Sequence, residues 1–197
     1  METKPTDNAE RELILLSQQG DKLAFAHLVQ LHYQQAISLA TYWTGNSDAA
    51  MDISQDAFVR IFRNIATFDI EKSFAAWLYT IVKHLSWNHN SRKKSRWLVF
   101  TDFLVNRNST FVENFGGSDT NSGEADLEID EQKAQIRRAM QQLSEPDREI
   151  ILLKDVQDYT YKDISEMLNI PAGSVMSRLF YARKKLAKLV EKEVKDE

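Results

Sequence analysis

One predicted helix near the middle of the chain combines basic and aromatic side chains on a single face. Four of them follow the spacing i, i+4, i+7 and i+11, which places side chains on one side of a helix: Lys83, Trp87, Asn90 and Lys94. Cations neutralise phosphates, and an exposed aromatic ring stacks on an unpaired base for about 1–3 kcal/mol. This face therefore predicts contact with distorted or single-stranded DNA. The alternative is an ordinary solvated helix end on which Trp87 folds onto a neighbour.

A second group of basic and aromatic side chains lies near the carboxyl end, on the later of two predicted helices. A tight turn at residues 169–171 joins these helices, a layout typical of a helix-turn-helix. Four apolar residues are expected to face inward: Val175, Leu179, Ala182 and Leu186. The side chains then available to a major groove are Ser174, Met176, Ser177, Phe180 and Tyr181, and those available to phosphates are Arg178, Arg183, Lys184 and Lys185. A plain helical hairpin with a basic solvated face is the alternative.

Carboxylates and apolar rings share another predicted helix, earlier in the chain. Asp52 and Asp56 are four residues apart with Gln55 between them. Three apolar side chains fall outside the inward stripe of this helix: Phe58, Val59 and Phe62. Exposed rings flanked by carboxylates would suit a protein-docking surface. The spacing alone favours the alternative, in which Phe58 and Phe62 pack beneath the preceding helix.

The net charge of −4 over 197 residues conceals two short basic segments. Residues 71–96 carry six basic and one acidic side chains (+5), and residues 159–190 carry six and two (+4). Residues 97–130 carry one basic and seven acidic side chains (−6). Because the Debye length is about 8 Å at physiological salt, a bound polyanion responds to local charge more than to a remote acidic segment. Two surfaces for a nucleic acid are therefore compatible with an acidic chain.

Composition and spacing argue against other functional classes. The absence of cysteine excludes disulfides, a thiol nucleophile and cysteine-ligated zinc. The histidine pairs 27/32 and 84/89 have a spacing that does not put both imidazoles on one helix face, and no glycine-rich phosphate loop or recognisable catalytic arrangement occurs. The start lacks a signal-peptide layout, and no run of about 18 apolar residues could span a bilayer. We expect a cytoplasmic protein with no enzyme activity, no cofactor, no bound metal and no membrane insertion.

Glycine and proline are scarce, with six and three in the whole chain, which favours helices. Amphipathic helices are expected at about residues 21–43, from Ser47 as N-cap to about residue 68, and at 73–91. Beyond a glycine-rich polar stretch, helices are expected at about residues 127–143, after Ser144, after a capping box at Thr160, and from about residue 172. The fold class is all-α: two small helical domains joined by a flexible linker, the carboxy-terminal one a helix-turn-helix. The predicted bounds are 1–96 for the first domain, 97–126 for the acidic linker and 127–197 for the second domain.

Four ordered motifs resemble those of the extracytoplasmic-function sigma factors, small initiation factors of bacterial RNA polymerase in the sigma-70 family. They are DISQDAF at residues 52–58, FD at 68–69 followed by FAAWLYTI at 74–81, LSEPDREIILL at 143–153, and YKDISEMLNIPAGSVMSRL at 161–179. Order and separation agree with the family from about residue 21 to residue 190. Each motif is weak by itself, whereas the ordered set is highly specific.

The resemblance implies three functional surfaces. One grips the clamp of the polymerase largest subunit: Asp52, Gln55, Asp56 and Phe58. A second reads and melts the minus-ten promoter element, with one base flipped into a pocket: Phe68, Asp69, Lys83, His84, Trp87, Asn88 and Arg92. The third, which also touches the polymerase flap, reads the minus-thirty-five element: Ser174, Met176, Ser177, Arg178, Phe180, Tyr181, Arg183, Lys184 and Lys185. Met176 departs from the Lys or Arg common in relatives, and His84, Ser165 and Asn169 depart from Asn, Ala and Gly.

The implied partners are core RNA polymerase, promoter DNA and an anti-sigma factor, often membrane-anchored in the family, that covers the polymerase-binding surfaces. The acidic linker would thread towards the active-site channel of the polymerase. A stand-alone helix-turn-helix regulator is the competing function. Such a regulator usually binds a palindrome as a dimer. The chain has no dimer heptad and no ligand domain, and it carries a second basic and aromatic surface that such a regulator would not need.

Overall fold

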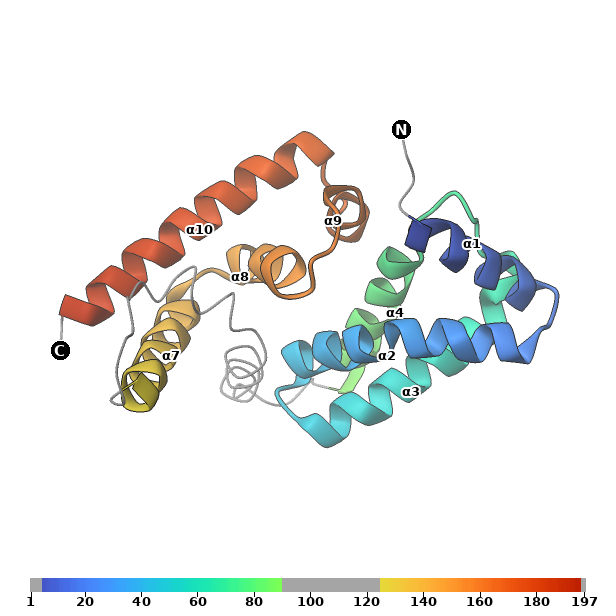
Figure 1. Ribbon diagram of the computed structural model, residues 1–197, viewed down its shortest axis with the longest axis horizontal. Helices are drawn as coiled ribbons and strands as arrows, with labels where there is room; N and C mark the ends of the chain where they lie inside the picture. The colour runs from blue at the N-terminus through green and yellow to red at the C-terminus, as the bar shows by residue number, and fades with distance from the viewer. Residues whose placement is uncertain (1–4, 90–124, 196–197) are drawn as a thin grey trace. The chain divides into compact units, whose positions relative to one another are not determined.

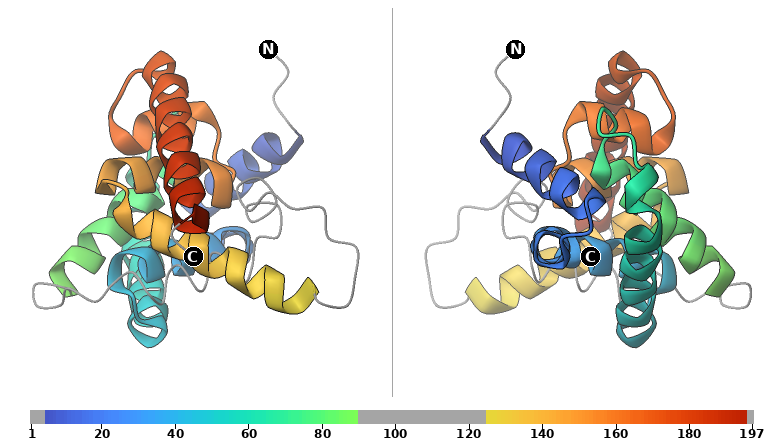
Figure 2. Two further views of the ribbon diagram at one scale, coloured as in Figure 1. Left: turned by 90° about the vertical axis from the view of Figure 1, so that its left-hand side faces the viewer. Right: turned by 90° about the vertical axis from the view of Figure 1, so that its right-hand side faces the viewer.

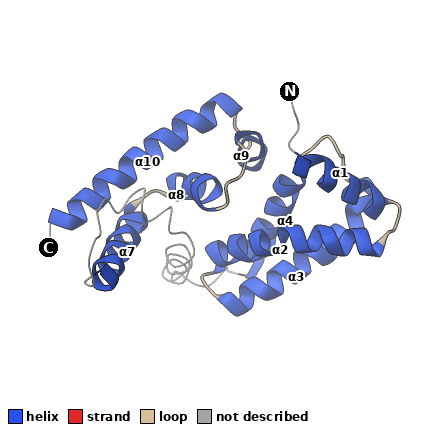
Figure 3. Ribbon diagram, in the orientation of Figure 1, coloured by secondary structure: helices blue, strands red, loops and turns tan. Residues whose placement is uncertain are grey.

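The structure is a computed structural model that describes residues 5–89 and 125–195. Every regular element within these ranges is helical (Figure 3), which confirms the predicted all-α class. The chain divides into two compact units, residues 1–96 and 97–197. Nearly all of the predicted linker lies outside the described residues, as do Asn90, Arg92 and Lys94. The linker and the domain bounds therefore stay predictions.

The first unit is a bundle of helices around one apolar core (Figures 1 and 2). Its elements are α1 (Pro5–Gln18), α2 (Lys22–Thr44), α3 (Ser47–Asn64), a short 3-10 turn η1 (Ile65–Thr67) and α4 (Phe74–His89). The long helix α2 packs against α1, α3 and α4. Core side chains with no exposed area include Leu28, Leu39, Ile61 and Leu78. The predicted apolar stripes of α2 and α3 thus meet in the centre of the unit.

Local capping sets the ends of α2 and α3. The Asp21 carboxylate accepts from the backbone N–H groups of Leu23 and Ala24 at 2.8 and 3.1 Å. Gly45 ends α2 in the left-handed region, with φ of 64°. Asn46, not the predicted Ser47, caps α3: its Oδ1 accepts from Ala49 N at 2.8 Å. The prediction was wrong by one residue because Asn46 keeps an extended backbone while Ser47 already lies in the helix.

Helix α1 was not predicted from the sequence. The structure buries Ile14 and Ser17 on it but leaves Leu15 exposed. Helix α1 packs against α2 and η1, and this packing adds to its stability in the first unit. Through Gln18, α1 also contacts the segment of residues 65–73.

The second unit contains α7 (Ala125–Gln142), α8 (Glu145–Ile151), a π-helical turn η2 (Leu152–Val156), α9 (Tyr161–Leu168) and α10 (Ala172–Lys195). The predicted capping box is confirmed: Thr160 N donates to Asp163 Oδ2 at 3.2 Å, and Asp163 N donates to Thr160 Oγ1 at 3.1 Å. Asn169 ends α9 with φ of 51°, as expected. The predicted inward row of α10 is fully buried: Val175, Leu179, Ala182 and Leu186.

Candidate nucleic-acid interface

Helix α10 presents three large apolar side chains to solvent. Met176, Phe180 and Tyr181 are 59%, 61% and 60% exposed. The rings of Phe180 and Tyr181 meet edge to face, with centroids 5.4 Å apart. Because the buried row occupies the opposite side of the same helix, these three side chains form an outward apolar row. Ser177 and Arg178 are exposed beside it, and Ser174 is half-buried. These residues lie where the second helix of a helix-turn-helix would meet a major groove.

The turn between α9 and α10 is held by hydrogen bonds between Ser165 and Ile170 and by the left-handed backbone of Asn169. The Ser165 hydroxyl donates to Ile170 O at 2.6 Å, and Ile170 N donates to Ser165 O at 3.1 Å. Asn169 supplies the left-handed residue that ends α9. Both departures noted in the sequence therefore preserve a rigid helix-turn-helix geometry.

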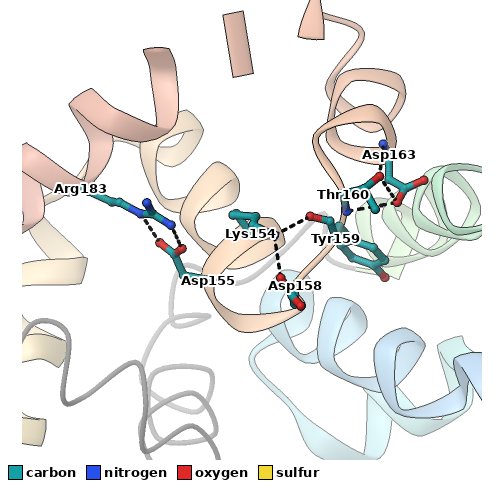
Figure 4. A network of polar contacts seen from close by, with 7 residues as sticks. All are labelled: Lys154, Asp155, Asp158, Tyr159, Thr160, Asp163 and Arg183. Carbon is teal, nitrogen blue, oxygen red and sulfur yellow. Dashed lines mark hydrogen bonds and ion pairs between the residues drawn. The ribbon is translucent and has the colours of Figure 1, made fainter. Parts of the chain in front are cut away.

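Arg183 and Lys185, both predicted as phosphate ligands, form ion pairs within the second unit, and their phosphate contacts stay a prediction. Arg183 makes a two-pronged ion pair with Asp155 of η2, with Nε to Oδ2 at 3.0 Å (Figure 4). This hydrogen bond raises the pKa of Arg183 above its ordinary value. The sequence could not reveal the pair, because its members lie 28 residues apart. The side chain of Arg183 thus joins α10 to η2 within the second unit.

A second ion pair joins Lys185 Nζ to Asp147 Oδ2 at 2.6 Å. Burial by itself would raise the pKa of Asp147, but hydrogen bonds from Lys185 and Ser144 outweigh it, and the net pKa lies below the ordinary value of 3.8. Arg178 and Lys184 are exposed, and the structure describes no carboxylate partner for either. Their phosphate contacts stay a prediction.

The segment between η2 and α9 is stabilised by the polar network of Figure 4. Lys154 Nζ donates to Asp158 Oδ1 at 2.6 Å and to Tyr159 O at 3.3 Å. Asp158 occupies the left-handed region with φ of 51°. This network stabilises the connection between η2 and α9. The Arg183–Asp155 pair joins η2 to α10.

The first unit exposes an aromatic side chain on the predicted face of α4. Trp87 is 57% exposed, so it is not folded onto a described neighbour. His84 and Asn88 are also exposed and lie on the same side of the helix. The alternative in which Trp87 folds onto a neighbouring side chain is therefore wrong within the described residues.

Lys83 is less available than its spacing suggests. Its Nζ donates to the Tyr79 hydroxyl at 3.0 Å and lies 4.8 Å from the centroid of the Trp43 ring. These contacts hold the ammonium against buried aromatic side chains of α2 and α4. The positive charge therefore lies at the edge of the α4 face, not at its centre.

Phe68 and Asp69 lie in the connection between η1 and α4. The Phe68 ring stacks on Trp77, with centroids 4.7 Å apart and ring planes 17° apart, so it serves mainly to anchor the loop. Asp69 is exposed, and its Oδ1 accepts from Glu71 N at 3.1 Å. Ser73 Oγ accepts from Ala76 N at 3.2 Å and starts α4. At about 1.5 Å per helical residue, Trp77 and Trp87 are separated by about 15 Å along α4.

Helix α3 exposes Asp52, Gln55 and Asp56, as predicted for a docking surface. Phe58 corrects the prediction: it is 6% exposed, and its ring lies 6.4 Å from that of Tyr33 on α2. Phe58 thus packs beneath α2, the alternative that its spacing favoured. The exposed apolar side chains on this helix include Phe62, whose ring lies 4.9 Å from that of Phe25, and Val59.

Comparison with known proteins assigns both units to one family. A model of sigma-70 region 2 matches residues 28–96, and a model of sigma-70 region 4 matches residues 133–186. The ECF RNA polymerase sigma factor SigW of Bacillus subtilis is 30% identical over 169 residues, covering 86% of this chain and 90% of that relative. The chain belongs to the ECF RNA polymerase sigma factors. The RNA polymerase sigma-H factor of Pseudomonas aeruginosa is 28% identical to this sigma factor, covering 94% of the chain and 96% of the relative.

Solved structures show the same fold for the sigma factor. CnrH, in complex with the cytosolic domain of CnrY, gives a TM-score of 0.64 at 21% identity and covers 93% of this chain and 98% of its own. The sigma factor RpoE from Bartonella quintana, in complex with the anti-sigma factor NepR, gives a TM-score of 0.54 at 20% identity, covering 85% and 96%.

The region matches also locate the surfaces of the sigma factor. Asp52, Asp69 and Trp87 lie within the region 2 match, and the outward apolar row of α10 lies within the region 4 match. Helix α1 precedes both. Among residues 5–89 and 125–195, no helix is long and apolar enough to cross a bilayer. Within the same part of the chain, no cluster of three or more His, Asp or Glu side chains could hold a metal ion.

Proposed function

We propose that this sigma factor binds core RNA polymerase and directs it to specific promoters, reading the minus-ten element with its first unit and the minus-thirty-five element with its second. The observation that carries this proposal is the presence of two separate solvent-facing aromatic surfaces in one chain. One holds Trp87 in the region 2 match, and the other holds Phe180 and Tyr181 in the region 4 match. A single duplex-binding module would need only the second surface.

At the minus-ten element the exposed ring of Trp87 stacks on a base that has left the duplex. Extruding a base costs a few kcal/mol, which stacking and hydrogen bonds offset. His84 and Asn88 lie beside Trp87 and contact the same strand, while Asp69 offers an acceptor from the loop before α4. Lys83 contributes long-range attraction because its ammonium is held against Trp43, and Phe68 supports the loop through Trp77. Arg92, outside the described residues, adds positive charge.

At the minus-thirty-five element α10 reads bases largely through apolar contacts. Thymine is the only base of DNA with a methyl group in the major groove, and apolar side chains recognise it there. The exposed row of Met176, Phe180 and Tyr181 thus favours an element that contains thymines. Ser174 and Ser177 add hydrogen bonds, and Arg178 and Lys184 contact phosphates.

Uracil substitution tests this apolar readout. Replacing a contacted thymine by uracil removes one methyl group, which is worth about 0.8 kcal/mol when buried, or about a fourfold loss of affinity. We expect holoenzyme binding, measured by competition on promoter fragments, to fall by that factor for minus-thirty-five thymines. Uracil in the spacer provides the control. The Phe180→Ala holoenzyme should no longer distinguish uracil from thymine at the contacted position; an undiminished penalty would assign the methyl contact elsewhere.

The protein partners follow from the α3 surface. Asp52, Gln55 and Asp56 contact the clamp of the polymerase largest subunit, with Phe62 and Val59 as the exposed apolar neighbours, and the second unit contacts the flap. An anti-sigma factor, anchored in the membrane, covers the polymerase-binding surfaces until a signal releases it. The site of action is the cytoplasm, where polymerase and promoters are. The activity is binding and DNA opening without enzyme chemistry.

A run-off transcription assay with core polymerase and genomic fragments tests the proposed function. The purified chain should direct core polymerase to discrete start sites, and the transcripts should reveal the promoter sequence. The isolated chain should bind the same fragments poorly, because each unit offers only a small DNA-binding surface. Tight, specific binding of duplex DNA without polymerase would instead support a stand-alone helix-turn-helix regulator.

A further inference from the structure

Helix α1 contacts the 65–73 segment, the connection that carries Phe68 and Asp69, through the side chain of Gln18. Gln18 Nε2 donates to Ile65 O at 3.0 Å and to Phe68 O at 2.7 Å. These are the two ends of the η1 turn, which Phe68 N closes by donating to Ile65 O at 3.0 Å. One amide group therefore bridges the whole turn from outside.

The bond to Phe68 O bears directly on Asp69. The Phe68 carbonyl belongs to the peptide group that joins Phe68 to Asp69, and peptide groups are planar. Holding that oxygen fixes the plane from which Asp69 departs. Phe68 is extended here, with φ of −68° and ψ of 130°. A helical hydrogen bond therefore does not hold the plane of the Phe68–Asp69 peptide group.

Arg11 provides a second contact on the far side of Asp69. Its guanidinium donates to Ile70 O at 3.3 Å and pairs with the Glu71 carboxylate at 2.6 Å. Both side chains are exposed, so this pair adds less than the part-buried Gln18 bonds. Asp69 thus lies between two residues, Phe68 and Ile70, whose carbonyl oxygens accept hydrogen bonds from α1 side chains.

The position of Gln18 is itself well determined. It is the last residue of α1, and Gly20, with φ of 92°, turns the chain so that Asp21 N donates to Leu16 O at 3.0 Å. Ile14 is buried, and Glu10 Oε2 lies 3.3 Å from His32 Nε2 on α2. Helix α1 is therefore a firm support for the Gln18 side chain.

We propose that Gln18 is a positioning residue for promoter reading: through it, α1 holds the 65–73 segment in the conformation that presents Asp69 to the minus-ten element. This inference rests on the proposed function, because it assumes that the segment contacts that element. It assigns a role in base selection to a helix that lies before the region 2 match, which begins at residue 28.

The test uses full-length holoenzyme and the promoter recovered in the run-off assay, with its minus-ten element randomised. Heparin-resistant complexes are sequenced to give the base preference at each position. Gln18→Met keeps the length of the side chain but removes the donor. We expect the preference at the position read by Asp69 to flatten by about five- to thirtyfold, the loss that one or two ordinary hydrogen bonds would give. Preference at the minus-thirty-five element and affinity for core polymerase should stay unchanged.

Gln19→Met is the matched control, because Gln19 is exposed at the next position and should leave all preferences unchanged. Arg11→Gln gives an independent readout from an exposed site and should reduce the base preference at the same minus-ten position, but by a smaller factor. If Gln18→Met fails to fold, Arg11→Gln still tests whether α1 holds the 65–73 segment for promoter reading. An unaltered minus-ten preference, or an equal loss on every promoter with a lower melting temperature, would overturn the proposal. Wild-type holoenzyme that selects no promoter would instead refute the proposed function.

Discussion

Reversing the charge of Asp52 and Asp56 to lysine is expected to abolish co-purification of the sigma factor with core RNA polymerase. The two carboxylates are exposed one turn apart on α3, and the structure describes no ion pair for either among residues 5–89. Their replacement therefore breaks no recorded internal contact. Truncating one partner of a buried interfacial charge pair costs about 2–5 kcal/mol, so reversing two should lower affinity by about a thousandfold or more.

The control for this experiment changes the net charge equally on other surfaces. Glu12→Lys combined with Glu191→Lys alters exposed positions on α1 and α10. This variant should co-purify with core polymerase like the wild type. Circular dichroism should show unchanged helix content for both double variants, because helix α3 is held by its opposite, apolar face. Wild-type recovery of polymerase with the Asp52/Asp56 variant would exclude this part of α3 as the docking surface.

Trp87→Ala should impair promoter opening far more than initial promoter binding. The ring is 57% exposed, so its removal leaves no cavity in the core, and any effect reports on DNA. Losing one base stack of about 1–3 kcal/mol corresponds to about a 5- to 150-fold loss of open complex. Permanganate reactivity of unpaired thymines measures the open complex, and fragment binding at low temperature measures the closed complex.

Two comparisons sharpen the Trp87 experiment. Trp87→Phe retains a stacking ring and should recover most of the opening activity, while a template with a pre-melted bubble should lessen the defect of Trp87→Ala. Lys83→Ala is a less direct probe, because Lys83 also contacts Tyr79 and Trp43 and its loss would affect folding. Equal loss of closed and open complexes in Trp87→Ala would remove the melting role from the α4 face.

Short-range patterns explain why much of the fold could be predicted. The buried row of α10, the capping box at Thr160 and the left-handed Asn169 all involve residues within a few positions of one another. Helical periodicity and helix capping depend on residues only a few positions apart, so both can be predicted from the sequence. The same holds for the exposure of Asp52, Asp56 and Trp87, which lie opposite apolar stripes on their own helices.

Where prediction failed, a distant part of the chain decided the outcome. Phe58 fell off the inward stripe of α3, yet α2 covers it through Tyr33. Arg183 was predicted as a phosphate ligand, and the fold brings Asp155 to it. The Arg183–Asp155 pair has no signal in local spacing, because a pairing between elements depends on how helices pack and not on their period, whereas spacing already favoured the packing of Phe58 beneath α2.

The sequence by itself determined the described helices other than α1, their apolar faces and the ordered motifs that indicate a sigma factor. Only the tertiary structure decided which of the outward side chains are free and which are committed to internal contacts. It also revealed the bridge from Gln18 to Phe68, whose members are 50 residues apart in the chain. The physical reason is one of range: helix periods and caps are set by neighbouring residues, whereas the partner of a side chain on a helix surface is set by the packing of whole elements.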